Sequence, residues 1–264
     1  MEIFSLDFLY FYLSGLLFGI AFFLSAWPIS IKMKKANIID VYWGYSFIFY
    51  FAFYSILSPQ TLSIPRYFLL AVCLIWCFRL GTYLLIRTVN EEHEDARYTE
   101  IKKDWGVTDK GFWPMFIFQG FLSWSVSICF AVIAVSPTHT LLFYTGGALS
   151  LLALIGESIA DKQLAAFKKN PDNRGTTCRV GLWFYSRHPN YFFEWLVWVG
   201  FFIASIGQKA GFLSLVSVLI MYRFLTKVSG AGFSEEIMLK SNKRPDYPEY
   251  VRVTNAFFPW FPKT

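Results

Sequence analysis

A short polar motif, Ser186–Glu194, carries the densest set of chemically useful side chains in the sequence. Pro189 suits the first turn of a helix, because its ring fixes φ and the N–H that it lacks would have no partner there. The start of a helix presents free N–H groups and partial positive charge, so this end, with Arg187 beside it, favours an anion such as pyrophosphate. Asn190 and Glu194 lie one turn apart in such a helix and could hydrogen-bond a carboxamide or a hydroxyl group. The motif therefore predicts a site for a ligand that carries phosphate and amide groups.

Five ionisable residues lie inside or directly beside apolar stretches, and such a residue near the bilayer centre costs about 2.5–3.5 kcal/mol on insertion scales and so indicates function. They are Asp40, Arg79, Glu157, Asp161 and Glu194. Several polar residues recur at intervals of four, which places each set on one helical face. These sets are Glu157 with Asp161, Asn190 with Glu194, and Arg79 with Tyr83 and Arg87. We expect the three faces to converge on one cavity; the alternatives are salt bridges between helices, such as Arg79 with Glu157, or side chains that reach to the membrane surface.

The elements that position these residues are expected to be membrane-spanning helices. Of the 264 residues, 55% are hydrophobic and 16% are charged, and the mean hydropathy is +0.43. A span needs about 20 mostly apolar residues. Seven stretches meet that requirement, at about 6–28, 37–57, 66–88, 113–135, 140–160, 190–207 and 211–229. We therefore expect an all-α, polytopic membrane protein with seven transmembrane helices, in which residues 1–264 form a single domain.

The basic residues predict how the spans are oriented. All but three of the 24 Lys and Arg residues lie in the final part of, or after, the first, third, fifth or seventh stretch. The exceptions are Arg66 and Lys209 on the opposite side and Arg79 inside a span. By the positive-inside rule the N-terminus is outside and the C-terminus is cytoplasmic. The net charge of +6 then reflects topology and a phosphorylated ligand rather than a nucleic-acid partner, in a multi-pass protein that would lie in the inner membrane if it is bacterial.

The sequence contains no signature of a metal centre or of a soluble nucleotide-binding domain. Cys73, Cys77, Cys129 and Cys178 form no CxxC pair, which favours small buried hydrophobic residues. No spacing of His, Cys and carboxylates suits a metal, and no GxGxxG or GKS/T loop is present. A nucleotide would have to be held by helices.

Seven segments of the chain form a recognisable pattern. They are Gly181–Trp195, which contains SRHPNY, and Asn37–Gly44, Trp76–Leu80, Glu94–Tyr98, Gly156–Glu157, Asp161–Leu164 and Phe167–Lys168. A Glu-Glu pair and a Tyr-Pro-x-Tyr segment near the C-terminus complete the pattern. Together they resemble the bacterial branch of the steroid 5α-reductase family. Related RHPxY and Glu-Glu motifs occur in membrane methyltransferases that use S-adenosylmethionine, such as isoprenylcysteine carboxyl and phospholipid methyltransferases.

The resemblance implies an enzyme that binds NADPH from the cytoplasmic side and reduces the carbon–carbon double bond of a lipophilic enone. It places Asn190 and Glu194 near the nicotinamide, and Tyr83, Asp161, Lys168 and Arg179 near the ribose, phosphates or adenine. The residues expected to bind the cofactor are Tyr83, Arg97, Tyr98, Glu157, Asp161, Lys168, Arg179, Arg187, His188, Asn190, Tyr191, Glu194, Glu235, Glu236 and Tyr247. Those expected to take part in catalysis are Asp40, Tyr83 and Glu194.

Two departures from the reductase pattern are visible. The second span lacks the Gln-Glu pair of the family, with Asp40 as its nearest acid, and Trp76 stands where a Tyr is expected. The tail carries Glu235 and Glu236 in place of a His-rich segment, and these acids could hold ribose hydroxyls, pair with Arg187 or cap a surface helix.

Three functions remain open on the sequence alone. The first is an NADPH-dependent reductase in which Asp40 or a Tyr polarises the carbonyl of the enone. The second is a methyltransferase that uses S-adenosylmethionine, a cofactor without phosphate that needs fewer of the basic residues at 162–187. The third is a non-enzymatic lipid-binding or transport protein, which predicts broken helices or internal repeats, and the sequence indicates neither. The expected partners are a lipophilic small molecule and membrane lipid, with no obligate protein partner.

Overall fold

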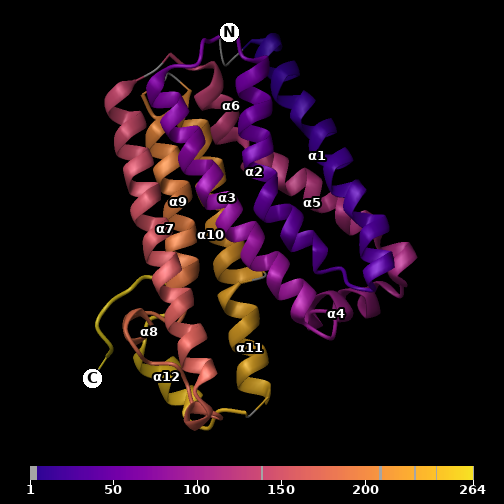
Figure 1. The fold of residues 1–264 in the computed structure, drawn as a ribbon, viewed down its shortest axis with the longest axis vertical. Coiled ribbons are helices and arrows are strands. Elements are labelled where there is room, and N and C mark those ends of the chain that lie inside the picture. The colour runs from indigo at the N-terminus through magenta and orange to yellow at the C-terminus, as the bar shows by residue number, and fades with distance from the viewer. Residues whose placement is uncertain (1–4, 138, 208–209, 229, 242, 264) are drawn as a thin grey trace. The chain divides into compact units, whose positions relative to one another are not determined.

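The computed structural model describes residues 5–137, 139–207, 210–228, 230–241 and 243–263, and across these residues it contains helices and no strand (Figure 1). The elements are α1 (Leu6–Met33), α2 (Ile38–Leu57), α3 (Ile64–Asn90), α4 (Ala96–Trp105), η1 (Asp109–Phe112), α5 (Trp113–Val126), α6 (Ile128–Val135), α7 (Thr140–Lys169), η2 (Pro171–Asn173), α8 (Leu182–Tyr185), α9 (Pro189–Ser205), η3 (Gly211–Ser214), α10 (Leu215–Arg223), the π-helix η4 (Phe224–Val228), α11 (Ala231–Ser241) and α12 (Tyr247–Val253). The expected all-α class is confirmed. Lys209, which the topology argument uses, lies outside the described residues.

Within the described chain, four helical segments are long and apolar enough to cross a membrane. They are α1, α3, α7 and the segment Gly211–Lys240, and the bent pair Asp109–Val126 and Ile128–Val135 would be a fifth if it forms one span. Helix α2, with 20 residues, and α9, with 17, coincide with the two remaining predicted stretches. Several apolar helices therefore indicate a membrane protein, while the count of seven spans and their orientation stay predictions.

The chain divides into two compact units. Unit 1 comprises Met1–Tyr144 and Ala204–Ser217, and unit 2 comprises Thr145–Ile203 and Val218–Thr264. The single domain expected from the sequence stays a prediction.

Small residues allow the helices of unit 1 to pack closely. Gly15 and Gly19, four residues apart on α1, leave room for the hydroxyls of Tyr54 and Tyr50, which a Cβ at either glycine would overlap. At the crossing of α1 with α5, a Cβ on Gly120 would lie 2.9 Å from the carbonyl oxygen of Gly19. Small residues at intervals of four commonly let membrane helices approach in this way. These glycines therefore fix the distances among α1, α2 and α5.

A bend of 41° at Ser127 separates α5 from α6. Ser127 Oγ donates to the carbonyl of Trp124 at 2.7 Å, and Ser217 Oγ donates to the carbonyl of Val126 at 2.6 Å. Serine hydroxyls that bond to backbone carbonyls commonly bend helices in this way. The sequence indicated no broken helix, so this bend is a finding of the structure.

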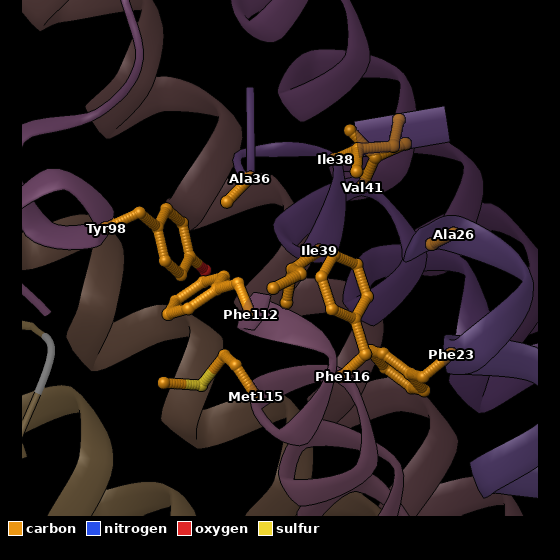
Figure 2. Close-up of a cluster of buried hydrophobic side chains, with 10 residues drawn as sticks. All are labelled: Phe23, Ala26, Ala36, Ile38, Ile39, Val41, Tyr98, Phe112, Met115 and Phe116. Carbon is orange, nitrogen blue, oxygen red and sulfur yellow. The ribbon is translucent and has the colours of Figure 1, made fainter. Parts of the chain in front are cut away.

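A buried apolar cluster gathers the ends of several helices of unit 1 (Figure 2). It consists of Phe23, Ala26, Ala36, Ile38, Ile39, Val41, Tyr98, Phe112, Met115 and Phe116. The rings of Tyr98 and Phe112 meet edge to face, with centroids 6.2 Å apart. Burial of Tyr98 in this cluster attaches α4 to α2, which positions the neighbouring Arg97.

Candidate functional site

The candidate site lies where α7 packs against α9 in unit 2. A Cβ on Gly200 of α9 would lie 2.5 Å from the carbonyl oxygen of Gly146 on α7, so the two backbones are nearly in contact. Nearer the other end of the pair, Gly156 of α7 leaves space that the ring of Phe193 occupies. The glycines therefore bring the polar faces of the two helices together.

Two of the three predicted polar faces meet at this end of the helix pair. Nδ2 of Asn190 donates a hydrogen bond to Oδ1 of Asp161 over 3.2 Å. Glu157 directly follows Gly156, and Glu194 directly follows Phe193. Because Gly156 and Phe193 are in contact, the two acids lie at the same level along α7 and α9. Glu157 is only 3% exposed. Asn190 and Asp161 therefore form a polar contact between the helices, and Glu157 and Glu194 lie one turn away from it on α7 and α9.

The side-chain oxygen of Asn190 is left unsatisfied in this site. Within the part of the chain that the structure describes, Oδ1 of Asn190 is buried and has no hydrogen-bond partner. An amide oxygen that loses water without gaining a donor costs about 1–3 kcal/mol. A ligand that donates an N–H or O–H to this oxygen would remove that cost.

Arg187 forms a different arrangement from the predicted anion seat. Its Nε and a terminal nitrogen donate to the two oxygens of Glu235 at 2.8 and 2.9 Å, and the other terminal nitrogen donates to the carbonyls of Val251 and Thr254. His188 Nε2 lies 2.8 Å from the same carboxylate. The side chain of Arg187 is 10% exposed. Its donors thus hold α11 and the end of α12, so they are engaged within the protein.

The second acid of the tail has a separate environment. Glu236 pairs with Lys240 one turn along α11, and both side chains are exposed. Of the roles left open for the two acids, pairing with Arg187 is confirmed for Glu235.

Arg179 and Lys168 keep more access to solvent. Arg179 donates to the backbone carbonyl of Asp246 at 2.9 Å and to Glu249 at 3.1 Å, with its guanidinium 5.4 Å from the centroid of the Tyr250 ring. Its side chain is 34% exposed and that of Glu249 is 59% exposed, so their ion pair contributes at most about 1 kcal/mol. Lys168 is exposed in the last turn of α7.

Two tyrosines of the predicted site are part of unit 2. Burial, assisted by the charge of Glu235, raises the pKa of Tyr247 to about 12. The ring of Tyr191 stacks on that of His188, with centroids 5.5 Å apart and planes 3° from parallel. Both tyrosines therefore lie beside the Arg187–Glu235 pair.

Asp40, Arg97 and Tyr98 belong to unit 1 and form a network of their own. The Asp40 carboxylate accepts hydrogen bonds from Arg97 at 2.8 Å and from the Tyr98 hydroxyl at 2.6 Å. Arg97 also donates to both oxygens of Asp95. Burial raises the pKa of Asp95, but hydrogen bonds and charge from Arg97, together with the charge of Arg87, outweigh burial and lower it. The oxygens of Asp40 thus have donors within the protein, and its expected role at an enone stays a prediction.

Tyr83, the third residue assigned to catalysis, lies on α3 in unit 1 and is 48% exposed. The guanidinium of Arg79 lies 5.9 Å from the centroid of its ring. Arg87, the next member of this face, pairs with Glu91 and Asp95. The interval of four residues therefore forms one helical face, as expected, and its polar end joins the Asp95 network.

Sequence reasoning missed the acids that organise both units. Asp246 accepts from the backbone N–H and the hydroxyl of Thr177 at 2.9 and 2.8 Å, and Asp95 accepts from the backbone N–H of Arg97 at the start of α4. A local signal existed for both, since an Asp directly before a helix is the preferred N-terminal cap. Their long-range partners gave no such signal.

A family profile described as "Protein of unknown function (DUF1295)" matches residues 26–254. The chain belongs to this family. DUF1295 is related to steroid 5α-reductase-like membrane proteins. The match covers all the residues of the site in unit 2 and the Asp40 network of unit 1. No curated protein and no solved structure matches the chain.

Proposed function

We propose that this DUF1295 protein is an NADPH-dependent membrane reductase of the bacterial steroid 5α-reductase branch, acting on a carbon–carbon double bond in a lipophilic enone. The observation that supports the proposal best is the buried, unpartnered Oδ1 of Asn190 beside Asp161. A carboxamide such as that of nicotinamide presents N–H donors of the kind that this oxygen lacks. The proposal includes seven spans with an external N-terminus and a cytoplasmic C-terminus.

The residues of unit 2 fit such a cofactor in part. Asn190 offers an acceptor to the amide. The exposed Lys168 and the partly exposed Arg179 are the basic residues of the predicted set that could hold phosphates. Arg187 is committed to Glu235 and to backbone carbonyls. The phosphates would therefore be held by side chains that solvent can reach, and binding should weaken as salt screens them.

The carboxyl groups of the site would act through electrostatics. NADPH, when bound, supplies a hydride, and its ring becomes more positive as the hydride leaves. In their ionised forms, Asp161, Glu194 and Glu157 would supply negative potential near the end of the helix pair where Asn190 lies. Fixed charge that opposes a developing charge is the main way in which enzymes stabilise a transition state. Asp161 would also help to orient the nicotinamide ring, because it holds the side chain of Asn190 in place.

The engagement of Arg187 favours a second candidate. A methyltransferase that uses S-adenosylmethionine binds a cation at sulfur and no phosphate, so it would require carboxyl groups near the reacting atom and would leave Arg187 to a structural role. The site has both features.

Two measurements distinguish the candidates. Mass spectrometry of the denatured, detergent-purified protein should detect NADPH if the cofactor is retained through purification. Titration with NADPH, NADH and S-adenosylmethionine at two ionic strengths should give tighter binding of NADPH, most clearly at low salt. Binding of S-adenosylmethionine with neither dinucleotide would overturn the reductase and favour the methyltransferase. Binding of none of the three would favour lipid binding or transport, for which the bend at Ser127 is the relevant feature.

A further inference from the structure

The C-terminal strap, residues 255–263, is held to the rest of unit 2 through its backbone. The backbone N–H of Arg187 donates to the carbonyl of Asn255 at 2.9 Å, and that of Trp260 donates to the carbonyl of Tyr185 at 3.0 Å. The N–H of Lys263 returns to the carbonyl of Val253 at 2.8 Å. These bonds fix the course of the strap without using its side chains.

Phe257 is the buried side chain of the strap, at 5% exposed, while three others contribute to an exposed aromatic surface. Phe258, Trp260 and Phe261 are 51, 71 and 67% exposed, and α8 adds the exposed rings of Phe184 and Tyr185. The Tyr185 and Phe261 rings meet edge to face with centroids 5.5 Å apart, which joins the two groups. An exposed aromatic patch of this size on a fixed backbone indicates a binding surface.

Charge and position favour one partner for this surface. Arg252 and Lys263 are exposed at its edge, and residues 250–263 contain no acid, so the surface complements phosphate headgroups. The inner ring, Phe258, packs 6.1 Å from the ring of Tyr222, which belongs to the candidate membrane span Gly211–Lys240. The aromatic patch is therefore continuous with a helix that is apolar enough to lie in a bilayer.

We propose that the C-terminal strap, with Phe184 and Tyr185, lies in the interfacial zone of a lipid bilayer. Aromatic side chains concentrate in this zone, because their rings are apolar and their polar atoms and neighbouring cations reach the headgroups. Ser186 Oγ donates to the carbonyl of Phe257 at 2.9 Å, which couples the strap to the loop that carries Arg187. The strap would thus hold that loop at the membrane surface, independently of which cofactor the protein binds.

Site-specific labelling tests the proposal in the full-length protein. The four native cysteines are buried, so a cysteine introduced by Phe261→Cys can be labelled selectively with an environment-sensitive fluorophore. The protein is placed one copy per nanodisc, in mixed phosphatidylcholine and phosphatidylglycerol with a quencher attached high on the acyl chain. We expect several-fold stronger quenching at position 261 than at the exposed Asp172→Cys, which lies in η2 of the same unit.

A second labelling position and a second nanodisc preparation make the result decisive. Trp260→Cys should behave like Phe261→Cys, because the bond from residue 260 to Tyr185 uses the backbone. Quenching at 260 and 261 no stronger than at 172 would overturn the proposal. The proposal would also be overturned if the labels at 260 and 261 were shielded from solvent only when each nanodisc holds two copies of the protein. The partner of the surface would then be a second protein molecule.

Discussion

Arg187 and Glu235, which are 48 positions apart in the sequence, form a bidentate ion pair. The ring of the neighbouring His188 is hydrogen-bonded to the same carboxylate. The pair joins the loop before α9 to α11, and the remaining bonds of Arg187 hold the end of α12. Its two side chains are only 10 and 15% exposed. The polar motif that predicts an anion seat therefore also joins α11 and the end of α12 to the start of α9.

We predict that Glu235→Gln destabilises the protein by about 3 kcal/mol, because removing one member of a largely buried pair leaves the other charge uncompensated. The matched control is Glu236→Gln, whose side chain is 61% exposed and pairs only along α11. Thermal unfolding in detergent should show a midpoint lowered by several degrees for the first variant and almost unchanged for the second. Equal midpoints would show that the pair adds nothing to stability.

The sequence predicted the helices well and the long-range polar contacts poorly. Apolar length is a local property, so each of the seven predicted stretches coincides with described helical structure, and Pro189 begins α9 as its fixed φ requires. The meeting of Asp161 with Asn190 followed from the interval of four residues on each helix. The partners of Arg187 lie 48 to 67 residues away, and no spacing rule connects a loop to a helix at that separation.

The contact between Gly19 and Gly120 leads to a prediction about helix packing. In Gly120→Ala, the new Cβ would meet backbone atoms of Gly19 and Ile20 at 2.9 Å, and backbone cannot move aside as a flexible side chain does. We expect a loss of about 1–3 kcal/mol in unfolding free energy, typical of overpacking. Leu17→Ala on α1 is the control, because that side chain is 72% exposed. A Gly120→Ala variant as stable as the wild type in detergent would show that α1 and α5 are farther apart than described.

The network around Asp95 predicts a dependence of stability on pH. Its pKa in the folded protein is below the unfolded value of about 3.9, so the ionised form stabilises the fold above that pH. This contribution is lost as the pH falls through the folded-state pKa. Asp95→Asn keeps a capping oxygen for α4 but removes the charge, so it should lower the unfolding midpoint at pH 7 and progressively less below about pH 4. If Asp95→Asn lowered the unfolding midpoint by the same amount at pH 7 and below pH 4, the effect would come from packing and not from charge.

The proposed topology predicts the side of the membrane on which two loops lie. Ser58 lies in the loop between α2 and α3, and His93 lies in the loop between α3 and α4. Fusions of alkaline phosphatase, which is active only outside the cytoplasm, should be active after Ser58 and inactive after His93. Activity at His93 alone would reverse the orientation, and activity at both positions would mean that α3 does not cross the membrane.

Asn190 provides the most direct test of the proposed cofactor site. Asn190→Ala removes the unpartnered oxygen together with the bond to Asp161, and the loss of such hydrogen bonds costs up to about 3 kcal/mol. NADPH affinity should therefore fall by up to about a hundredfold. Asp161→Asn keeps an acceptor for Asn190 and should have a smaller effect, while Asn170→Ala, an exposed position beyond α7, should have none. Unfolding midpoints show whether each variant is intact. Unchanged NADPH affinity in an intact Asn190→Ala variant would place the nucleotide away from the contact between α7 and α9. Lower NADPH affinity in the Asn170→Ala control would mean that the measurement reports on the charged loop and not on the Asn190 amide.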